Sequence, residues 1–312
     1  MTHASAPHSV GKGRPDFGRR PSCDIVARPV SRRIATDYDW AWKEAAKAGN
    51  RDHVFNDWRS RRESISLAEW PPVYDSFRNS RQSVLYRLAV EDVVAAASRT
   101  GHSLGRISFS ETLVDENRFA ADISPCYPVI MILHDLMEAL GRVPLWRDFE
   151  EHLVSRQDVC LRYFIEAGGI PPVTRVDGMW DHPRMRAVRW RLGLFYYSFL
   201  RDVHTIVTLR RTHGLDVRYH PLLDAEWKAD AICGDVRIEL YVVNSTYKDA
   251  DKAGRKKLCS RLNPGLPVVE GKMAVKKDRG SCWLYSPESI SLLAAEIASK
   301  GGPSVPSFNR PR

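Results

Sequence analysis

In the first half of the chain, apolar residues recur every three to four positions, which is the spacing of one helix face. This spacing predicts helical structure over 37–62, interrupted at Gly49-Asn50. A further helix is predicted over 81–99, and Gly101 ends it. We therefore expect the chain to begin its folded part with helices.

Three more helices joined by tight turns are predicted in the stretch that follows. The first covers 130–140 and ends at Gly141, a residue type suited to a left-handed helix cap. Pro144 begins the second, and the third covers 159–167. Such helices are compatible with a helix-turn-helix-like bundle that reads DNA, and also with helices that only pack together.

A long helix is predicted over 183–211. Pro183 stands at its start and Gly214 lies just beyond its end, as helix-boundary preferences require. Arginine alternates with apolar residues in its first half, whereas its second half is largely apolar.

Beyond Gly214 the pattern changes to the alternation and short apolar runs of β-strands. The predicted elements are strands over 215–220, 222–233 and 236–243, a basic helix over 244–262, strands over 266–275 and 281–286, and a helix over 287–299. The predicted fold class is therefore α+β, with a helical N-terminal region followed by an α/β domain around a central mixed sheet.

The change of pattern near residue 180 predicts a helical domain over 36–180 and a mixed domain over 181–298. Residues 1–35 are rich in Gly, Pro, Ser and Arg, which predicts a basic disordered arm. This arm would either solubilise the chain or bind DNA. Residues 299–312 are predicted to form a disordered tail.

The composition, with 43% hydrophobic and 27% charged residues, is that of a globular protein. A formal net charge of +9 favours polyanionic partners, with nucleic acid first and an anionic membrane surface second. The six cysteines form no CxxC pair, which argues against a zinc module and a disulfide framework. Because no apolar run has signal-peptide or membrane-spanning length, we expect a cytoplasmic protein without a membrane partner.

Two acids stand within the apolar runs on either side of Gly234-Asp235. Asp230 lies in the first run and Glu239 in the second. Such acids either face water at a sheet edge or converge on a metal. Their neighbours are mainly Ala, Ile, Leu and Val, and an unpaired carboxylate is costly to bury in such company, so the metal hypothesis is favoured.

The order of a long helix, a strand, a strand with Asp and a strand with Glu resembles the PD-(D/E)xK nuclease superfamily, whose fold is called restriction-endonuclease-like. The resemblance covers 183–298. It implies that Asp230 and Glu239 hold Mg²⁺, with Mn²⁺ as an alternative, because hard cations take carboxylate oxygens. It also implies a third metal-site acid on the long helix, where Asp202 is the acid present.

The same family usually has a lysine two residues after the Glu, which orients the attacking water. Here that position is Tyr241. The missing ammonium group would come from Lys228, two residues before Asp230, or from Lys248 at the start of the basic helix. A decayed copy that no longer cleaves would show the same substitution.

Basic residues concentrate after the second acid. Residues 242–280 contain ten Lys or Arg and four acids, which suits contacts with phosphates and also a solvated helix face. The predicted nucleic-acid contacts are Lys252, Arg255, Lys256, Lys257 and Arg261.

These observations predict a metal-dependent DNA endonuclease, acting on double-stranded DNA, as part of a mobile-element or defence system. It would act as a homodimer or with a partner protein subunit. The alternative is a non-catalytic nucleic-acid-binding subunit on a decayed nuclease fold. A third hypothesis is an interaction protein whose basic surfaces meet an acidic protein.

Overall fold

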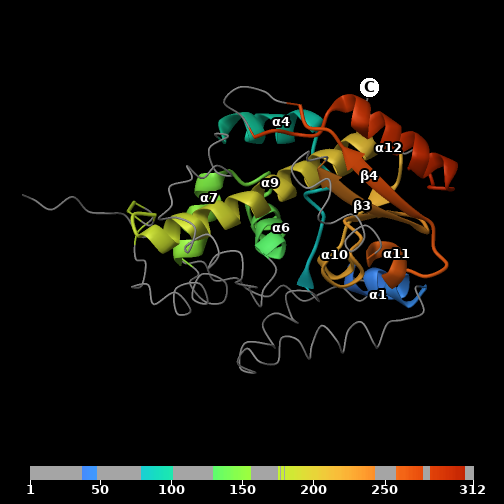
Figure 1. Cartoon of the computed structure of the whole chain (residues 1–312), viewed down its shortest axis with the longest axis horizontal. Helices are drawn as coiled ribbons and strands as arrows, with labels where there is room; N and C mark the ends of the chain where they lie inside the picture. The colour runs from blue at the N-terminus through green and yellow to red at the C-terminus, as the bar shows by residue number, and fades with distance from the viewer. Residues whose placement is uncertain are drawn as a thin grey trace, which may run out of the picture. The chain divides into compact units, whose positions relative to one another are not determined.

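A computed structural model describes residues 37–47, 79–100, 129–155, 175, 177–178, 180–242, 258–276 and 282–305. All of them belong to one compact unit, Ala35–Arg312. Within these ranges the chain forms eight helices and one four-stranded mixed sheet, so the coarse α+β prediction is confirmed (Figure 1).

The helices are numbered as in Figure 1. They are α1 (Asp37–Lys47), α4 (Val90–Arg99), α6 (Val129–Leu140), α7 (Trp146–Ser155), α9 (Pro183–Arg211), α10 (Pro221–Trp227), α11 (Leu258–Leu262) and α12 (Pro287–Ser299). The predicted helices over 130–140, 183–211 and 287–299 are confirmed almost to the residue. The predicted helix over 159–167 lies outside the described residues.

The helix predicted over 81–99 begins only at Val90. Ala89 before it is extended, with ψ 160°, and the Asp92 carboxylate accepts the Ala89 backbone N–H as an N-terminal cap. Val84 and Leu85 are nevertheless buried. The apolar spacing before Val90 therefore comes from a hydrogen-bonded turn that packs on the core, and this segment is not helical.

The sheet contains β1 (Val217–Arg218), β2 (Ala231–Cys233), β3 (Val236–Val242) and β4 (Val268–Met273) in that spatial order. The pairs β1–β2 and β2–β3 are antiparallel, whereas β3–β4 is parallel. Gly234, with φ +58°, turns the chain between β2 and β3. The predicted strand over 281–286 is reduced to an isolated bridge between Val275 and Tyr285.

Helix α10 occupies the first half of the stretch predicted as a strand over 222–233, and only Ala231–Cys233 form a strand there. Pro221 stands in its first turn, and the His220 side chain accepts the Leu222 backbone N–H. Both are helix-start signals. The apolar residues Leu222, Leu223 and Trp227 fit one face of a two-turn helix as well as a buried strand, which explains the error.

The two faces of the sheet meet different helices, because side chains alternate along a strand. Ala231 and Ile238 pack into the cluster that contains α4, α6, α9 and α12, whereas Ile232 packs with α1, α10 and Cys259 of α11. Figure 1 shows α12 beside β4.

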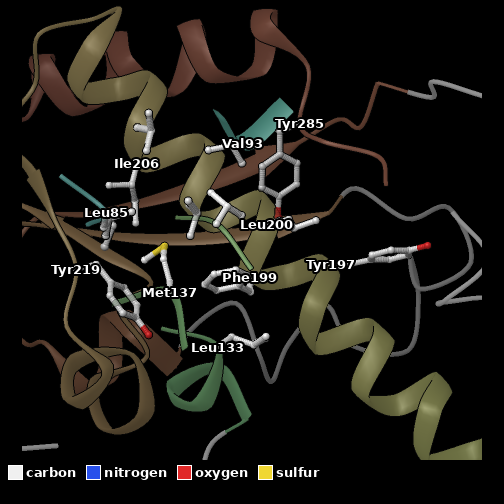
Figure 2. Close-up of a cluster of buried hydrophobic side chains, with 14 of the residues drawn as sticks. Leu85, Val93, Leu133, Met137, Tyr197, Phe199, Leu200, Ile206, Tyr219 and Tyr285 are labelled. Carbon is white, nitrogen blue, oxygen red and sulfur yellow. The ribbon is translucent and has the colours of Figure 1, made fainter. Parts of the chain in front are cut away.

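The larger core is built around α9. Its residues Phe199, Leu200 and Ile206 are fully buried and meet Leu133 of α6 and Val93 of α4, as Figure 2 shows. Because this helix is buried on most sides in its second half, a largely apolar sequence is required there.

Arg237 of β3 is fully buried between the sheet and α1. Its guanidinium donates to the Glu44 carboxylate at 3.3 Å, to the Glu44 carbonyl at 3.0 Å and to the Asn263 Oδ1 at 3.4 Å. Burial of a charge is tolerated only with such partners. This ion pair therefore ties α1 to the sheet face that carries the odd-numbered residues of β3.

The chain after α12 stays bonded to the fold as far as Val305. The Pro303 carbonyl accepts the Asp216 N–H at 2.9 Å, and Val305 N–H donates to the Gly214 carbonyl. The first residues of the predicted tail over 299–312 are thus part of the folded unit. The predicted arm over 1–35 lies outside the described residues.

A search of the described helices for a long, apolar segment able to cross a membrane finds none.

Candidate functional site

Asp230 and Glu239 lie near each other at the open end of the β2–β3 hairpin. Asp230 directly precedes β2, and Glu239 follows Ile238, the register partner of Ala231. The charge of Glu239 adds to the rise in the pKa of Asp230, which shows that the two carboxyls are within electrostatic range of each other. The Asp230 carboxylate also accepts the backbone N–H of Leu240, which holds its orientation.

Glu239 is half-buried, and its Oε2 atom accepts no hydrogen bond from the described residues. Burial, followed by the neighbouring charge of Glu270, raises the pKa of this carboxyl to about 7, and Lys228 opposes the rise. Glu270 is its register partner on β4. Among the described residues, the carboxyl therefore has the distant charge of Lys228 but no hydrogen-bond donor to its Oε2 atom.

Two further acids from helices lie within electrostatic range of Asp230. Burial raises its pKa well above the ordinary range, and Asp224 of α10 and Asp202 of α9 add to the rise. Asp202 is itself buried, with its pKa raised by burial and then by Asp224. The structure thus gathers Asp202, predicted from the sequence, with Asp224, which sequence reasoning missed.

Asp224 was missed because its stretch was predicted as a strand. In α10 it faces inward, where the Tyr219 hydroxyl donates to its Oδ2 at 3.3 Å. Burial raises the pKa of Asp224 to about 6, and Lys228 opposes the rise. The signal that identifies this acid is the helix start at Pro221, since in a helix Asp224 and Lys228 are one turn apart.

Lys228 ends α10 in a left-handed conformation with φ 55°, the only positive φ among the described residues other than glycine. Glycine or asparagine is the usual residue at such a cap. The sequence interpretation that placed Lys228 on the strand of Asp230 is wrong, because β2 begins only at Ala231. Its positive charge nevertheless lies near the site, since it lowers the pKa of Asp224 and of Glu239.

Tyr241 lies on β3 and shares the sheet face of Glu239. Its hydroxyl donates to the Glu270 Oε2 at 3.4 Å. Burial, followed by the charge of Glu270, raises the pKa of Tyr241 to about 12, so the hydroxyl remains a proton donor at neutral pH. The adjacent residue of β4 in the parallel register is Lys272.

The predicted basic contacts are mostly outside the described residues. This holds for Lys248, Lys252, Arg255, Lys256 and Lys257. Arg261 is described and is exposed on α11. Helix α11 lies near the site, because Glu239 and Asp230 add to the burial that raises the pKa of its Cys259 thiol to about 12.

A groove of about 480 Å³ lies between β4 and α12, next to the Glu239–Glu270 pair. Glu270 and Lys272 line it from the strand, and Leu292, Glu296 and Lys300 line it from the helix and the residue after it. Leu292 is 73% exposed. The groove therefore gives solvent and larger molecules access to the strand residues beside the site.

The carboxyls of Asp230 and Glu239 could bind a divalent cation only as a site with two protein ligands. In the described parts of the chain, no three Asp, Glu, His or Cys side chains converge closely enough to hold a metal ion. Two neighbouring carboxylates remain as candidate ligands, those of Asp230 and Glu239. A cation bound there would offset the repulsion that raises their pKa values, and the Glu239 Oε2 atom without a hydrogen-bond donor fits such a ligand.

Chemically, the site combines the neighbouring carboxyls of Asp230 and Glu239 with the buried Asp202, the partly buried Asp224 and the nearby ammonium group of Lys228. Such a set can bind a hard cation and orient water or a phosphate beside it. No protein-family model, no curated protein and no solved structure matches this chain.

Proposed function

We propose that this chain is a metal-dependent endonuclease that hydrolyses phosphodiester bonds of double-stranded DNA. The observation that carries the proposal is the gathering of acids around Asp230, where the charges of Asp224, Asp202 and Glu239 all add to the burial that raises its pKa. Carboxyls with pKa values shifted by burial and by neighbouring charges cluster at functional sites.

The topology supports the proposal. A long helix, three antiparallel strands, a helix, a fourth strand parallel to the third and a closing helix follow one another from α9 to α12. The resemblance to PD-(D/E)xK nucleases rests on the first part of this order, the long helix and three strands, although Asp230 directly precedes its strand and does not lie within it. The short helix α10 is inserted between the first two strands.

The roles of the side chains follow from their contacts. Asp230, held by the Leu240 N–H, and Glu239 would bind Mg²⁺ or Mn²⁺. The cation would supply polarisation of the phosphoryl oxygen and acidification of a water molecule. Lys228 offsets the charge of Glu239 and would orient the water. As the water oxygen bonds to phosphorus, the bond from phosphorus to the sugar oxygen breaks, and the water proton leaves to solvent while the sugar oxygen is protonated.

Asp202 of α9 and Asp224 of α10 would control the protonation of Asp230. Their charges raise the pKa of Asp230, which makes its deprotonation depend on the arrival of a positive charge. The site would therefore load its cation with the release of protons, and a direct ligand role for Asp202 is a further part of the proposal.

The test is cleavage of plasmid and linear DNA with Mg²⁺ by the full chain. We expect Asp230→Asn and Glu239→Gln to abolish cleavage while DNA binding in chelator is retained. Glu91→Gln is the matched control, because Glu91 is an exposed acid of α4. Cleavage that survives both site substitutions would rule out this assignment.

A second candidate function is a nucleic-acid-binding subunit without catalytic activity. Tyr241, in place of the lysine that the resemblance implies, favours it. This function predicts salt-dependent DNA binding with no cleavage in Mg²⁺ or Mn²⁺, by the chain alone or with a partner subunit.

A further inference from the structure

The parallel register of β3 and β4 brings a second set of charged side chains to the candidate site. Glu239 is paired with Glu270, and Tyr241 is paired with Lys272. Adjacent strands of a sheet lie about 4.8 Å apart, and residues that are paired across two adjacent strands point to the same face of the sheet. Lys272 therefore lies beside the position where the resemblance implies an ammonium group, but on the adjacent strand.

Lys272 differs from the other lysines near the groove. It is exposed and makes no hydrogen bond or ion pair with any described residue. Lys300, by contrast, donates to the Glu296 carboxylate at 3.0 Å and to the Val268 carbonyl at 2.7 Å. The ammonium group of Lys272 is thus available to a ligand, whereas that of Lys300 is already bonded.

Lys272 and Glu270 line both the groove and the strand next to Glu239. A molecule in the groove between β4 and α12 would therefore touch the edge of the candidate site. The exposed Leu292 on the opposite wall offers an apolar contact of the kind that a deoxyribose or a base can use.

We propose that Lys272 supplies the ammonium group that contacts the phosphate to be cleaved, and that the groove between β4 and α12 receives the DNA strand carrying it. This inference rests on the proposed function. A phosphodiester gains negative charge on its oxygens as water attacks, and a fixed positive group beside it stabilises that charge. Lys228 has a different role, because its charge partly offsets the rise in the pKa values of Asp224 and Glu239.

The experiment compares four new variants of the full chain with the wild type and with Glu239→Gln. Lys272→Met removes the charge at similar length, and Lys272→Arg restores it. Lys228→Met tests the competing lysine. Lys43→Met is the control, because Lys43 is an exposed lysine of α1.

Two readouts are taken for each variant. The first is the rate of Mg²⁺-dependent DNA cleavage, which we expect Lys272→Met to lower by about 100-fold or more, as for loss of one charge-stabilising donor. We expect Lys272→Arg to recover about tenfold of this loss and Lys43→Met to match the wild type. The second readout, taken in chelator, is the slope of the logarithm of DNA affinity against the logarithm of salt concentration. This slope is negative, and its magnitude should decrease by about 0.9 when one phosphate contact is lost.

The outcomes separate this inference from the proposed function. Loss of cleavage in Glu239→Gln together with wild-type cleavage in Lys272→Met overturns the inference and leaves the proposed function standing. Wild-type cleavage in Glu239→Gln overturns the proposed function. If the wild type binds DNA without cleaving it, an unchanged salt slope in Lys272→Met overturns the inference, and a slope lowered by about one supports the phosphate contact.

Discussion

Replacement of Glu239 by glutamine removes a half-buried carboxyl whose Oε2 atom has no donor among the described residues. Burial and the charge of Glu270 raise the pKa of this carboxyl from 4.5 to about 7 in the folded chain. A raised pKa means that the folded state binds the proton more tightly than the unfolded state does. The stabilisation from this group is therefore complete below pH 4.5 and is lost as the pH rises through 7.

The magnitude follows from the shift. At 1.36 kcal/mol per pKa unit, the rise corresponds to about 3 kcal/mol before any allowance for solvent. Because Glu239 is only half-buried, water screens part of this energy, and we expect about 1–2 kcal/mol. Glutamine carries no charge at any pH. Glu239→Gln should therefore be more stable than the wild type at pH 8 by this amount and should show no gain at pH 4.5.

The assay is thermal unfolding in chelator at pH 4.5 and pH 8, followed by circular dichroism. The expected gain at pH 8 corresponds to a melting temperature higher by roughly 2–6 °C. Addition of Mg²⁺ at pH 8 should then raise the melting temperature of the wild type but not that of Glu239→Gln. The exposed Glu91→Gln serves as the control.

An equal effect of Glu239→Gln at the two pH values would refute the reasoning, because the penalty would not then depend on ionisation. A loss of stability at pH 8 would do so as well. A gain in stability at pH 8 without any effect of Mg²⁺ would support the electrostatic cost of ionising Glu239 but would contradict the metal site.

Three further predictions concern other contacts. Arg237→Met should destabilise the chain by about 1.5–3 kcal/mol in urea unfolding because it removes the buried charged hydrogen bonds to Glu44, whose carboxylate keeps only Lys47 among the described residues, and a loss below about 1 kcal/mol would contradict this ion pair's role. Lys228→Gly should stabilise the chain by about 1 kcal/mol at pH 4.5, where the left-handed backbone is relieved and the nearby acids are largely protonated, and any destabilisation there would contradict it. Mg²⁺ affinity should rise from pH 6 to pH 8 as Asp224 and Glu239 ionise, with proton release visible in calorimetric titrations in two buffers, and a pH-independent affinity would exclude these carboxyls.

Local signals in the sequence were sufficient for several helices. Gly141 ends α6, Pro183 begins α9, and Pro287 with the Ser286 cap begins α12. Each of these residues acts within one turn of the helix end, so its effect does not depend on distant contacts. The β2–β3 hairpin is of the same kind, because Gly234 supplies the positive φ of the turn.

The region over 222–233 was predicted wrongly although a local helix-start signal, Pro221, precedes it. A run of apolar residues of this length fits a buried strand or one face of a short helix, and burial on both sides removes the periodicity that would distinguish them. The choice of a helix follows from Pro221 and the His220 cap. Asp224 and Lys228 therefore came to the site only through the helix that the pattern did not predict.

The nearness of Asp230 and Glu239 was determined by the sequence alone, because a tight hairpin sets its own register and both acids stand directly beyond its last pair, Ala231↔Ile238. The nearness of Glu270 and Lys272 was decided only by the tertiary structure. Parallel strands are joined by long connections, so nothing local determines which residue of β4 meets Glu239 or Tyr241. That register depends instead on how the helices pack over both faces of the sheet.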